Sequence, residues 1–165
     1  MVNCGKTNIN LPPTKKTMPN LIGTYSCRID SKSRLMLPAA HKKQLDPVIK
    51  QEFVLKKSLY NECLEFYPIS EWNKETMMFD TMNKLLKDTR DLMRKFSAGF
   101  KTVELDNVGR LLIPKDLLEY SGIKNEVVVV SMINYLEIWA KAKYEKFEND
   151  PTINVAELAE RVAKK

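Results

Sequence analysis

The sequence predicts an α+β fold in which two similar ββαββ units pair into one small β-barrel, with a helical segment between them. Two internal repeats carry this prediction. The phrase DSKSRLMLP at residues 30–38 returns as DNVGRLLIP at 106–114, and CLEFY at 63–67 returns as YLEIW at 135–139. A unit of roughly 50 residues is too small to bury a core alone, so the two halves are expected to share one.

Each unit begins with an alternating strand that runs into a tight turn. In the first unit Tyr25, Cys27 and Ile29 are expected on one face of the strand. The turns at 30–33 and 106–109 hold Asp, Asn and Gly, residue types that suit tight backbone geometry. A short apolar strand, RLMLP or RLLIP, is expected to leave each turn.

A short helix follows in each unit, at 39–46 and at 115–121. Both follow a proline, which suits the first turn of a helix, and Gly122 supplies a stop for the second. Two strands then close each unit, EFVLKKS with CLEFYP and EVVVVSM with YLEIWA. Glu65 and Glu137 lie between apolar neighbours in the last strands, so they are expected to point outward.

Residues 71–98, between the units, are predicted to be helical, either as one helix or as two that are broken near Asp88–Asp91. Apolar residues recur there at helical spacing: Met78, Met82, Leu85, Leu86, Leu92, Met93 and Phe96. This methionine-rich stripe indicates either core or a surface that contacts another helix.

The two chain ends are predicted to lie outside the repeats. The first twenty residues contain Lys6, Lys15 and Lys16 and no acid, which is typical of a disordered basic arm. The tail is expected to form a short amphipathic helix whose apolar side packs on its own or a neighbouring subunit. The resulting boundaries are an arm at 1–20, a first repeat at 21–75, a helical linker at 76–98, a second repeat at 99–150 and a tail at 151–165.

The composition indicates a globular protein and argues against a membrane span or a signal peptide. The chain has 165 residues, of which 44% are hydrophobic and 29% charged, as in ordinary globular proteins. No apolar run approaches the roughly 20 residues of a membrane span, and the start lacks a signal-peptide pattern. Cys4, Cys27 and Cys63 have no metal-ligand spacing, and reduced thiols are expected at the latter two. A cytoplasmic protein without metal or cofactor is therefore predicted.

Charge is distributed unequally between the repeats. The formal net charge is +6, which suits a polyanionic partner. Residues 28–57 hold eight basic and three acidic side chains, whereas residues 99–150 hold seven basic and nine acidic ones. Glu104 even takes the place that Arg28 has in the first repeat. The first repeat is thus predicted to meet phosphate, the alternative being a solvated basic face.

An aspartate and an arginine stand four residues apart in both copies of the repeated phrase. Asp30 and Asp106 are expected to accept hydrogen bonds from turn amides and to orient Arg34 and Arg110. An arginine on such a loop can bridge guanine O6 and N7. Flanking basic residues would contact phosphates, and the candidates are Arg28, Lys32, Lys42 and Lys43. For the second copy, a purely turn-locking role stays open.

The stretches GTYSCRIDSKSRLMLP, LDNVGRLLIP, CLEFYPISEW and YLEIW resemble the MraZ family of bacterial transcriptional regulators, in the AbrB-like swapped-hairpin superfamily. The resemblance covers about residues 21–147. It implies two AbrB-type halves that form a barrel and protomers that assemble into rings. It also implies binding to short direct repeats of double-stranded DNA in the promoter of the division and cell-wall gene cluster, with repression, and a nucleoid-associated location.

The resemblance assigns DNA contact to Lys32 and Arg34 in the first copy and to Arg110 in the second. Ser33 stands where the family usually has glycine. A different geometry for the first turn is therefore an open alternative.

Two other classes of function compete with DNA binding. An enzyme is not expected, because His41 has no recognisable nucleophile or carboxylate partner and is expected on the surface, and no small-molecule substrate is indicated. A protein-interaction module, like the antidotes that share the AbrB-like fold, would need a long disordered tail. The present tail, VAELAERVAKK, is short. That module, without promoter specificity, remains the alternative.

Overall fold

The computed structural model describes residues 20–165, so the arm predicted at 1–20 lies almost wholly outside the described residues. The strands are β1 (Thr24–Arg28), β2 (Arg34–Met36), β3 (Phe53–Lys57), β4 (Leu64–Pro68), β5 (Lys101–Val103), β6 (Arg110–Leu112), β7 (Glu126–Ser131) and β8 (Leu136–Ala140). The helices are α1 (Ala39–Leu45), α2 (Ile69–Thr76), α3 (Lys87–Ser97), α4 (Lys115–Ser121), α5 (Lys141–Glu148) and α6 (Val155–Ala163), with 3-10 turns η1 (Asp46–Val48) and η2 (Met77–Thr81).

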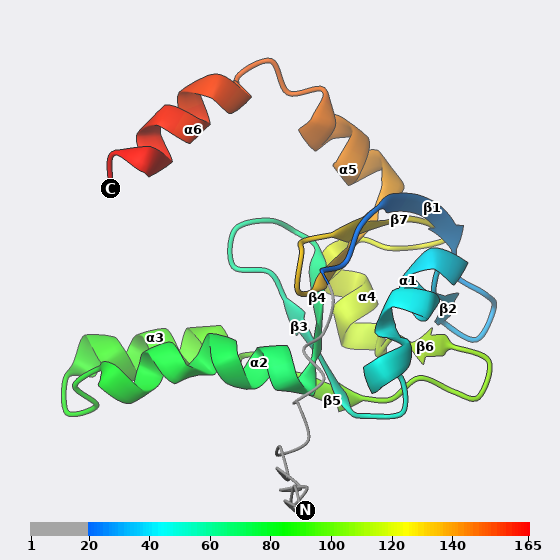
Figure 1. Ribbon diagram of the computed structural model, residues 1–165, viewed down its shortest axis with the longest axis horizontal. Coiled ribbons are helices and arrows are strands. Elements are labelled where there is room, and N and C mark those ends of the chain that lie inside the picture. The colour runs from blue at the N-terminus through cyan, green and yellow to red at the C-terminus, as the bar shows by residue number, and fades with distance from the viewer. Residues whose placement is uncertain (1–19) are drawn as a thin grey trace, which may run out of the picture.

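The two units exchange strands. The main sheet is antiparallel and has the order β1-β7-β8-β4-β3-β5 (Figure 1). Strand β1 of the first unit pairs with β7 of the second, and β5 of the second pairs with β3 of the first. The last strands, β4 and β8, meet at the centre of the sheet. The predicted α+β fold, with a duplicated unit sharing one core, is confirmed, and neither half has a complete sheet without the other.

A second, two-stranded sheet joins the two repeated phrases. Strands β2 and β6 pair antiparallel. Single bridges, Ile29 with Leu35 and Leu105 with Leu111, connect this ribbon to the segments that follow β1 and β5. These links are isolated bridges and not continuous ladders, so the closed barrel remains a prediction.

The helices that follow the repeated phrases begin where the sequence predicts. Pro38 and Pro114 take the N-cap positions of α1 and α4, with extended backbone angles that direct the chain into the helix. Gly122 ends α4 in a left-handed conformation, with φ of 68°. Both helices bury leucine against the shared core, which also contains Leu35 and Leu111 from the ribbon.

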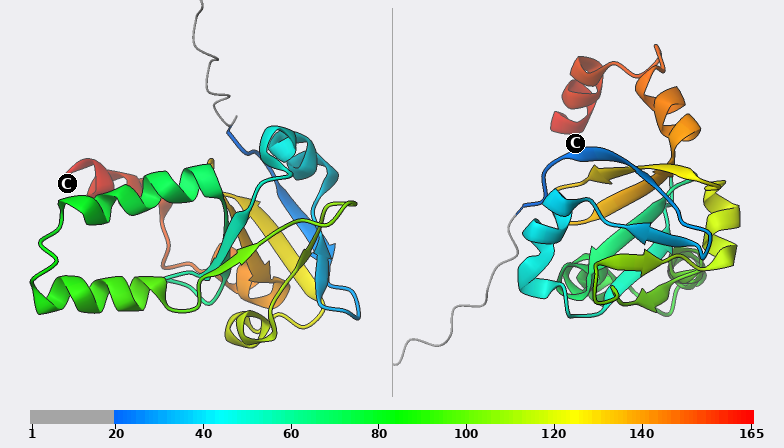
Figure 2. Two further views of the ribbon diagram at one scale, coloured as in Figure 1. Left: turned by 90° about the horizontal axis from the view of Figure 1, so that it is seen from below. Right: turned by 90° about the vertical axis from the view of Figure 1, so that its right-hand side faces the viewer.

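The segment between the units forms a hairpin of helices that projects from the sheet (Figure 2). The predicted break near Asp88–Asp91 is wrong, because α3 begins at Lys87 and contains both acids. Asp91 instead contacts Lys87 and Arg94 along the helix. The chain breaks earlier, where Met82 is extended and the Asn83 side chain accepts a hydrogen bond from the amide of Leu85 at 3.0 Å.

The glutamates of β4 and β8 are not solvated. Glu65 and Glu137 stand opposite each other across the central strand pair and are only 7% and 9% exposed. They point away from the apolar core, as predicted, but other side chains cover them: Lys56 lies against Glu65, and Trp139 lies against Glu137. The Lys56 ammonium lies 2.5 Å from Glu65 and 5.3 Å from the Phe96 ring centroid. Burial raises the pKa of Glu137, whose carboxylate accepts a hydrogen bond from Trp139.

The tail does form a helix, but it makes no packed layer with the rest of its own chain. Helix α5 contacts β7 and β8, and α6 follows it away from the sheet (Figure 1). Every residue of α6 is exposed, including Val155, Leu158 and Val162 on its apolar side. Of the two predicted positions for this side, packing on its own chain is wrong for the described residues, and packing on a neighbouring subunit stays a prediction.

Candidate nucleic-acid interface

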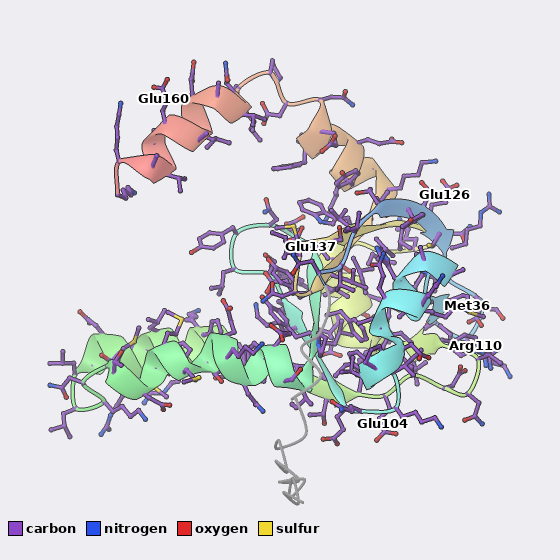
Figure 3. The ribbon with its side chains drawn as sticks, in the orientation of Figure 1. Met36, Glu104, Arg110, Glu126, Glu137 and Glu160 are labelled. Carbon is purple, nitrogen blue, oxygen red and sulfur yellow. The ribbon has the colours of Figure 1, made fainter. Side chains whose placement is uncertain are left out.

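The two repeated turns lie at one end of the molecule, opposite the helical hairpin (Figure 1). The β2–β6 ribbon brings them together, because Arg34 pairs with Leu112 and Met36 pairs with Arg110. Met36 and Arg110 accordingly lie side by side in Figure 3. The sequence placed each turn within its own unit, and the tertiary structure combines them into one surface.

Asp30 locks the first turn through three hydrogen bonds. Its Oδ1 accepts from the amides of Lys32 at 2.8 Å and Arg34 at 3.0 Å. Its Oδ2 accepts from Nε of Arg34 at 2.8 Å. The backbone closes the same turn, since the amide of Ser33 donates to the Asp30 carbonyl at 3.0 Å. The side chain therefore satisfies the turn amides that no strand partner reaches.

Asp106 makes the same set of bonds in the second turn. Its Oδ1 accepts from the amides of Val108 at 3.1 Å and Arg110 at 2.9 Å, and its Oδ2 from Nε of Arg110 at 2.6 Å. Ser33 and Gly109 take equivalent left-handed conformations, with φ of 61° and 82°. The serine thus keeps the turn geometry at the cost of some backbone strain, and the alternative of a different first turn is wrong.

Each aspartate leaves part of its arginine available. The guanidinium is held at Nε, and its side chain is 28% exposed at Arg34 and 32% exposed at Arg110. Within residues 20–165 the terminal nitrogens of these two arginines make no hydrogen bond. A planar group fixed at one edge presents its other donors in a set direction, which is the arrangement that bidentate contact with guanine requires.

The same bonds hold the pKa of both aspartates below the ordinary value. The largest cause at Asp30 and at Asp106 is the hydrogen bond from the backbone amide of the arginine four residues on. Hydrogen bonds from the arginine side chain and its positive charge act in the same direction. Both carboxylates are therefore ionised at neutral pH and keep the arginines oriented.

The other predicted DNA-contact residues surround this ribbon in different ways. Lys32 and Lys43 are exposed and free to point outward. Arg28 faces Glu126 across the β1–β7 pair, 3.6 Å from its carboxylate, so part of its charge is neutralised. Figure 3 shows Glu126 and Glu104 on opposite sides of Arg110, which places acid at both margins of the surface.

Lys42 has a contact that the sequence does not predict. It extends from α1 of the first unit to the second turn, where its ammonium donates to the carbonyl of Val108 at 3.4 Å and lies 3.5 Å from the sulfur of Met36. Its stem covers Gly109 so closely that an added Cβ would lie 2.4 Å from the lysine Cδ. No local pattern signals a contact between residues 66 positions apart, so only the structure reveals this support.

A cleft of about 320 Å³ opens beside that contact. Lys42 and Lys50 line it on one side, and Leu105 and Val108 line it on the other. The two lysines flank the second turn from the first unit. They add positive charge to a repeat whose own sequence is acidic, so the electrostatic contrast between the repeats is smaller in space than along the chain.

His41 is buried, and its predicted surface position is wrong. It is 0% exposed in α1, and its Nε2 donates to the carbonyl of Gly23 at 3.2 Å while Tyr25 packs edge-on against the ring. Burial lowers the pKa of His41, which favours the neutral ring.

Both cysteines of the described residues are free thiols. Cys63 is buried and Cys27 is half-buried. Burial raises the pKa of Cys63 to about 12.

Residues 20–165 contain neither a membrane-spanning helix nor a metal cluster. No described helix has the length and apolar character to cross a membrane. No group of three or more His, Cys, Asp or Glu side chains in that part of the chain is arranged to hold a metal ion.

The chain belongs to the MraZ family. The family model described as "MraZ protein, putative antitoxin-like" matches it twice, at residues 21–95 and 96–165. The chain is 50% identical over 145 residues to a protein of Christiangramia forsetii named transcriptional regulator MraZ, covering 88% of this chain and 94% of that protein. Proteins of the same name match at 43% in Flavobacterium psychrophilum, over 88% and 92%, and at 33% in Acetivibrio thermocellus, over 86% and 95%.

Proposed function

We propose that this protein is a transcriptional regulator that binds double-stranded DNA through the surface formed by its two turns. The observation that carries the proposal is the pair of Asp-locked arginines on one ribbon, Asp30 with Arg34 and Asp106 with Arg110. The relatives named above are called transcriptional regulators, which supports the same function.

The proposed recognition divides between base and phosphate contacts. Arg34 reads a guanine edge with its terminal nitrogens, because its Nε is committed to Asp30. Lys32 and Lys43 contact phosphates and set the register, and Arg28 and Lys42 add to the same positive surface. Arg110 contributes from the second turn. This reading requires no catalytic group, metal or small-molecule substrate, and the protein is proposed not to be an enzyme.

The protein is further proposed to act as a homo-oligomeric ring on direct repeats in the promoter of the division and cell-wall gene cluster, as a cytoplasmic, nucleoid-associated repressor. Several subunits that meet several repeats would gain affinity through effective concentration without new contacts. Occupation of a promoter by such an assembly excludes polymerase.

Footprinting on the DNA upstream of its own gene tests the proposal. Short protected repeats are expected with the unaltered chain, and Arg34→Ala is expected to abolish protection at the same concentration. Glu160→Ala, on the distant helix α6, serves as the matched control. If the unaltered chain protected nothing upstream of its gene at low salt, promoter binding would be refuted.

A protein-interaction or antidote-type module is the second candidate, and the exposed apolar side of α6 favours it. Size-exclusion chromatography separates the two candidates. A ring elutes far above the 19.1 kDa of one chain, whereas a simple antidote elutes as a dimer.

A further inference from the structure

Helix α6 is a folded element without a partner in the described chain. Asn154 caps it by accepting hydrogen bonds from the amides of Ala156 at 2.9 Å and Glu157 at 3.3 Å. Val155, Leu158 and Val162 recur on one side, and they are 79%, 40% and 73% exposed. A helix of nine residues is marginal in water by itself. Its apolar side therefore needs a surface to cover it.

The helical hairpin offers such a surface. A groove of about 390 Å³ lies between α2, η2 and α3, and its apolar lining includes Trp72, Met77, Phe79, Met93, Phe96 and Phe100. The aromatic floor is fixed by stacking, since the Trp72 and Phe96 rings lie 5.5 Å apart and nearly parallel. The methionines at the rim are flexible, which suits a binding surface, and Met77 is 63% exposed.

The helix and the groove match in size and kind. Nine helical residues extend about 13 Å, and the eleven residues of α3 extend about 16 Å. An amphipathic helix that lays its apolar side into a groove between helices is a recurring mode of recognition. Arg161 borders the apolar side of α6, and the margin of the groove carries both signs of charge, with Lys84 3.9 Å from the exposed Asp80.

The connection to α6 directs it away from its own groove. Helix α5 is anchored on the sheet, where the ring of Trp139 contacts those of Tyr144 and Phe147. The turn after α5 is also fixed, because Thr152 donates to Asp150 from its amide at 2.9 Å and its hydroxyl at 2.6 Å. With this path α6 stands clear of the hairpin (Figure 1), and each chain has one helix to donate and one groove to fill.

We propose that α6 of one copy binds in the α2–α3 groove of a second copy. The contact joins different surfaces on the two copies, so it is heterologous and produces a ring when the rotation between neighbours closes. The inference rests on the homo-oligomer proposed above and names the surfaces that build it. The occupant is a second copy of this chain, because the helix and the groove are both left open by the same fold.

Disulfide trapping between two differently substituted chains tests the proposal. One chain carries Leu158→Cys on α6 and the other carries Met77→Cys at the rim of the groove. Both carry Cys4→Ser and Cys27→Ser, and Cys63 is retained because it is buried. On mild oxidation the mixture is expected to yield a covalent species of twice the 19.1 kDa chain mass. Glu160→Cys, on the polar side of α6, replaces Leu158→Cys in the control, and at least fivefold less product is expected.

The outcomes separate this inference from the wider proposal. The docking mode is overturned if Leu158→Cys and Glu160→Cys yield equal amounts of covalent dimer. It is also overturned if a chain that carries both Leu158→Cys and Met77→Cys forms the disulfide within itself. If Leu158→Asp left the assembly at full size by light scattering, α6 would not be the joint, although the ring and its DNA binding would stand. If the unaltered chain were a monomer at micromolar concentration, both the ring and this joint would fail.

Discussion

The turn at Asp30–Arg34 and the turn at Asp106–Arg110 share every bond of the lock and differ in what surrounds it. In both, one carboxylate accepts from two amides and one guanidinium. The first turn carries Lys32 on its surface. The second lies under Lys42 of the other repeat, and Val108 takes the position that Lys32 has in the first. The bonds that set backbone geometry are thus the same in both copies, whereas the surface around them differs, which fits the proposal that Arg34 and Lys32 of the first copy contact DNA.

The largest expected difference between the turns concerns the two arginines. Arg34→Ala should weaken specific promoter binding by about 1–3 kcal/mol, roughly 5- to 150-fold, because a bidentate base contact is lost. Arg110→Ala should weaken it less, since residues 99–150 of its repeat hold more acidic than basic side chains. Titrations of promoter DNA measure both, with thermal unfolding as the control for folding. An equal loss of affinity for promoter and random duplexes with Arg34→Ala would show that this arginine reads phosphate.

The left-handed position of each turn should respond in opposite directions. Gly109→Ala should destabilise the protein by about 1–2 kcal/mol, because alanine is strained at this φ and its Cβ would meet Lys42. Ser33→Gly removes that strain but frees the unfolded chain, so a gain of at most about 1 kcal/mol is expected. Urea unfolding measures both. If Gly109→Ala were neutral, the close contact with Lys42 would be disproved.

The two neighbouring lysines of α1 should separate phosphate contact from turn support. Lys43→Ala should make the slope of log K against log salt less negative by about 0.9, as expected for one lost phosphate contact. Lys42→Ala should also lower the thermal stability, because it removes the support of the second turn at Val108. The salt series and a melting curve on each variant decide this. Identical melting temperatures would mean that Lys42 supports nothing.

The smallest effect is expected from acid, and it should be equal in the two turns. Each aspartate has a lowered pKa, so its stabilising contribution is complete above the ordinary pKa of about 3.9 and is lost as pH falls through the lowered value. Asp30→Asn and Asp106→Asn should each flatten the loss of stability below pH 4 by the same amount. Melting temperatures of each variant from pH 2 to 7 measure this loss of stability. Unequal changes in the two variants would argue that the two Asp–Arg locks differ.

Much of the candidate site could be predicted because its signals are local. The acid, the arginine and the left-handed residue lie within five positions, and a turn of that length has few ways to satisfy its amides. The support from Lys42 could not be predicted, and neither could the burial of His41. Both depend on which distant segments the fold brings together, and a single sequence contains no pattern for that.

The sequence by itself determined the duplication, the succession of strands within each repeat, and the Asp–Arg lock in each turn, because periodicity and turn chemistry act over a few neighbouring residues. Helix α5 was not predicted. Only the tertiary structure decided that the halves exchange strands, that β2 and β6 bring the two turns onto one surface, and that Glu65 and Glu137 are buried. Those outcomes follow from how two incomplete sheets bury apolar surface against each other. The free energy gained by this burial arises only when the two repeats pack together, so neither repeat alone can determine it.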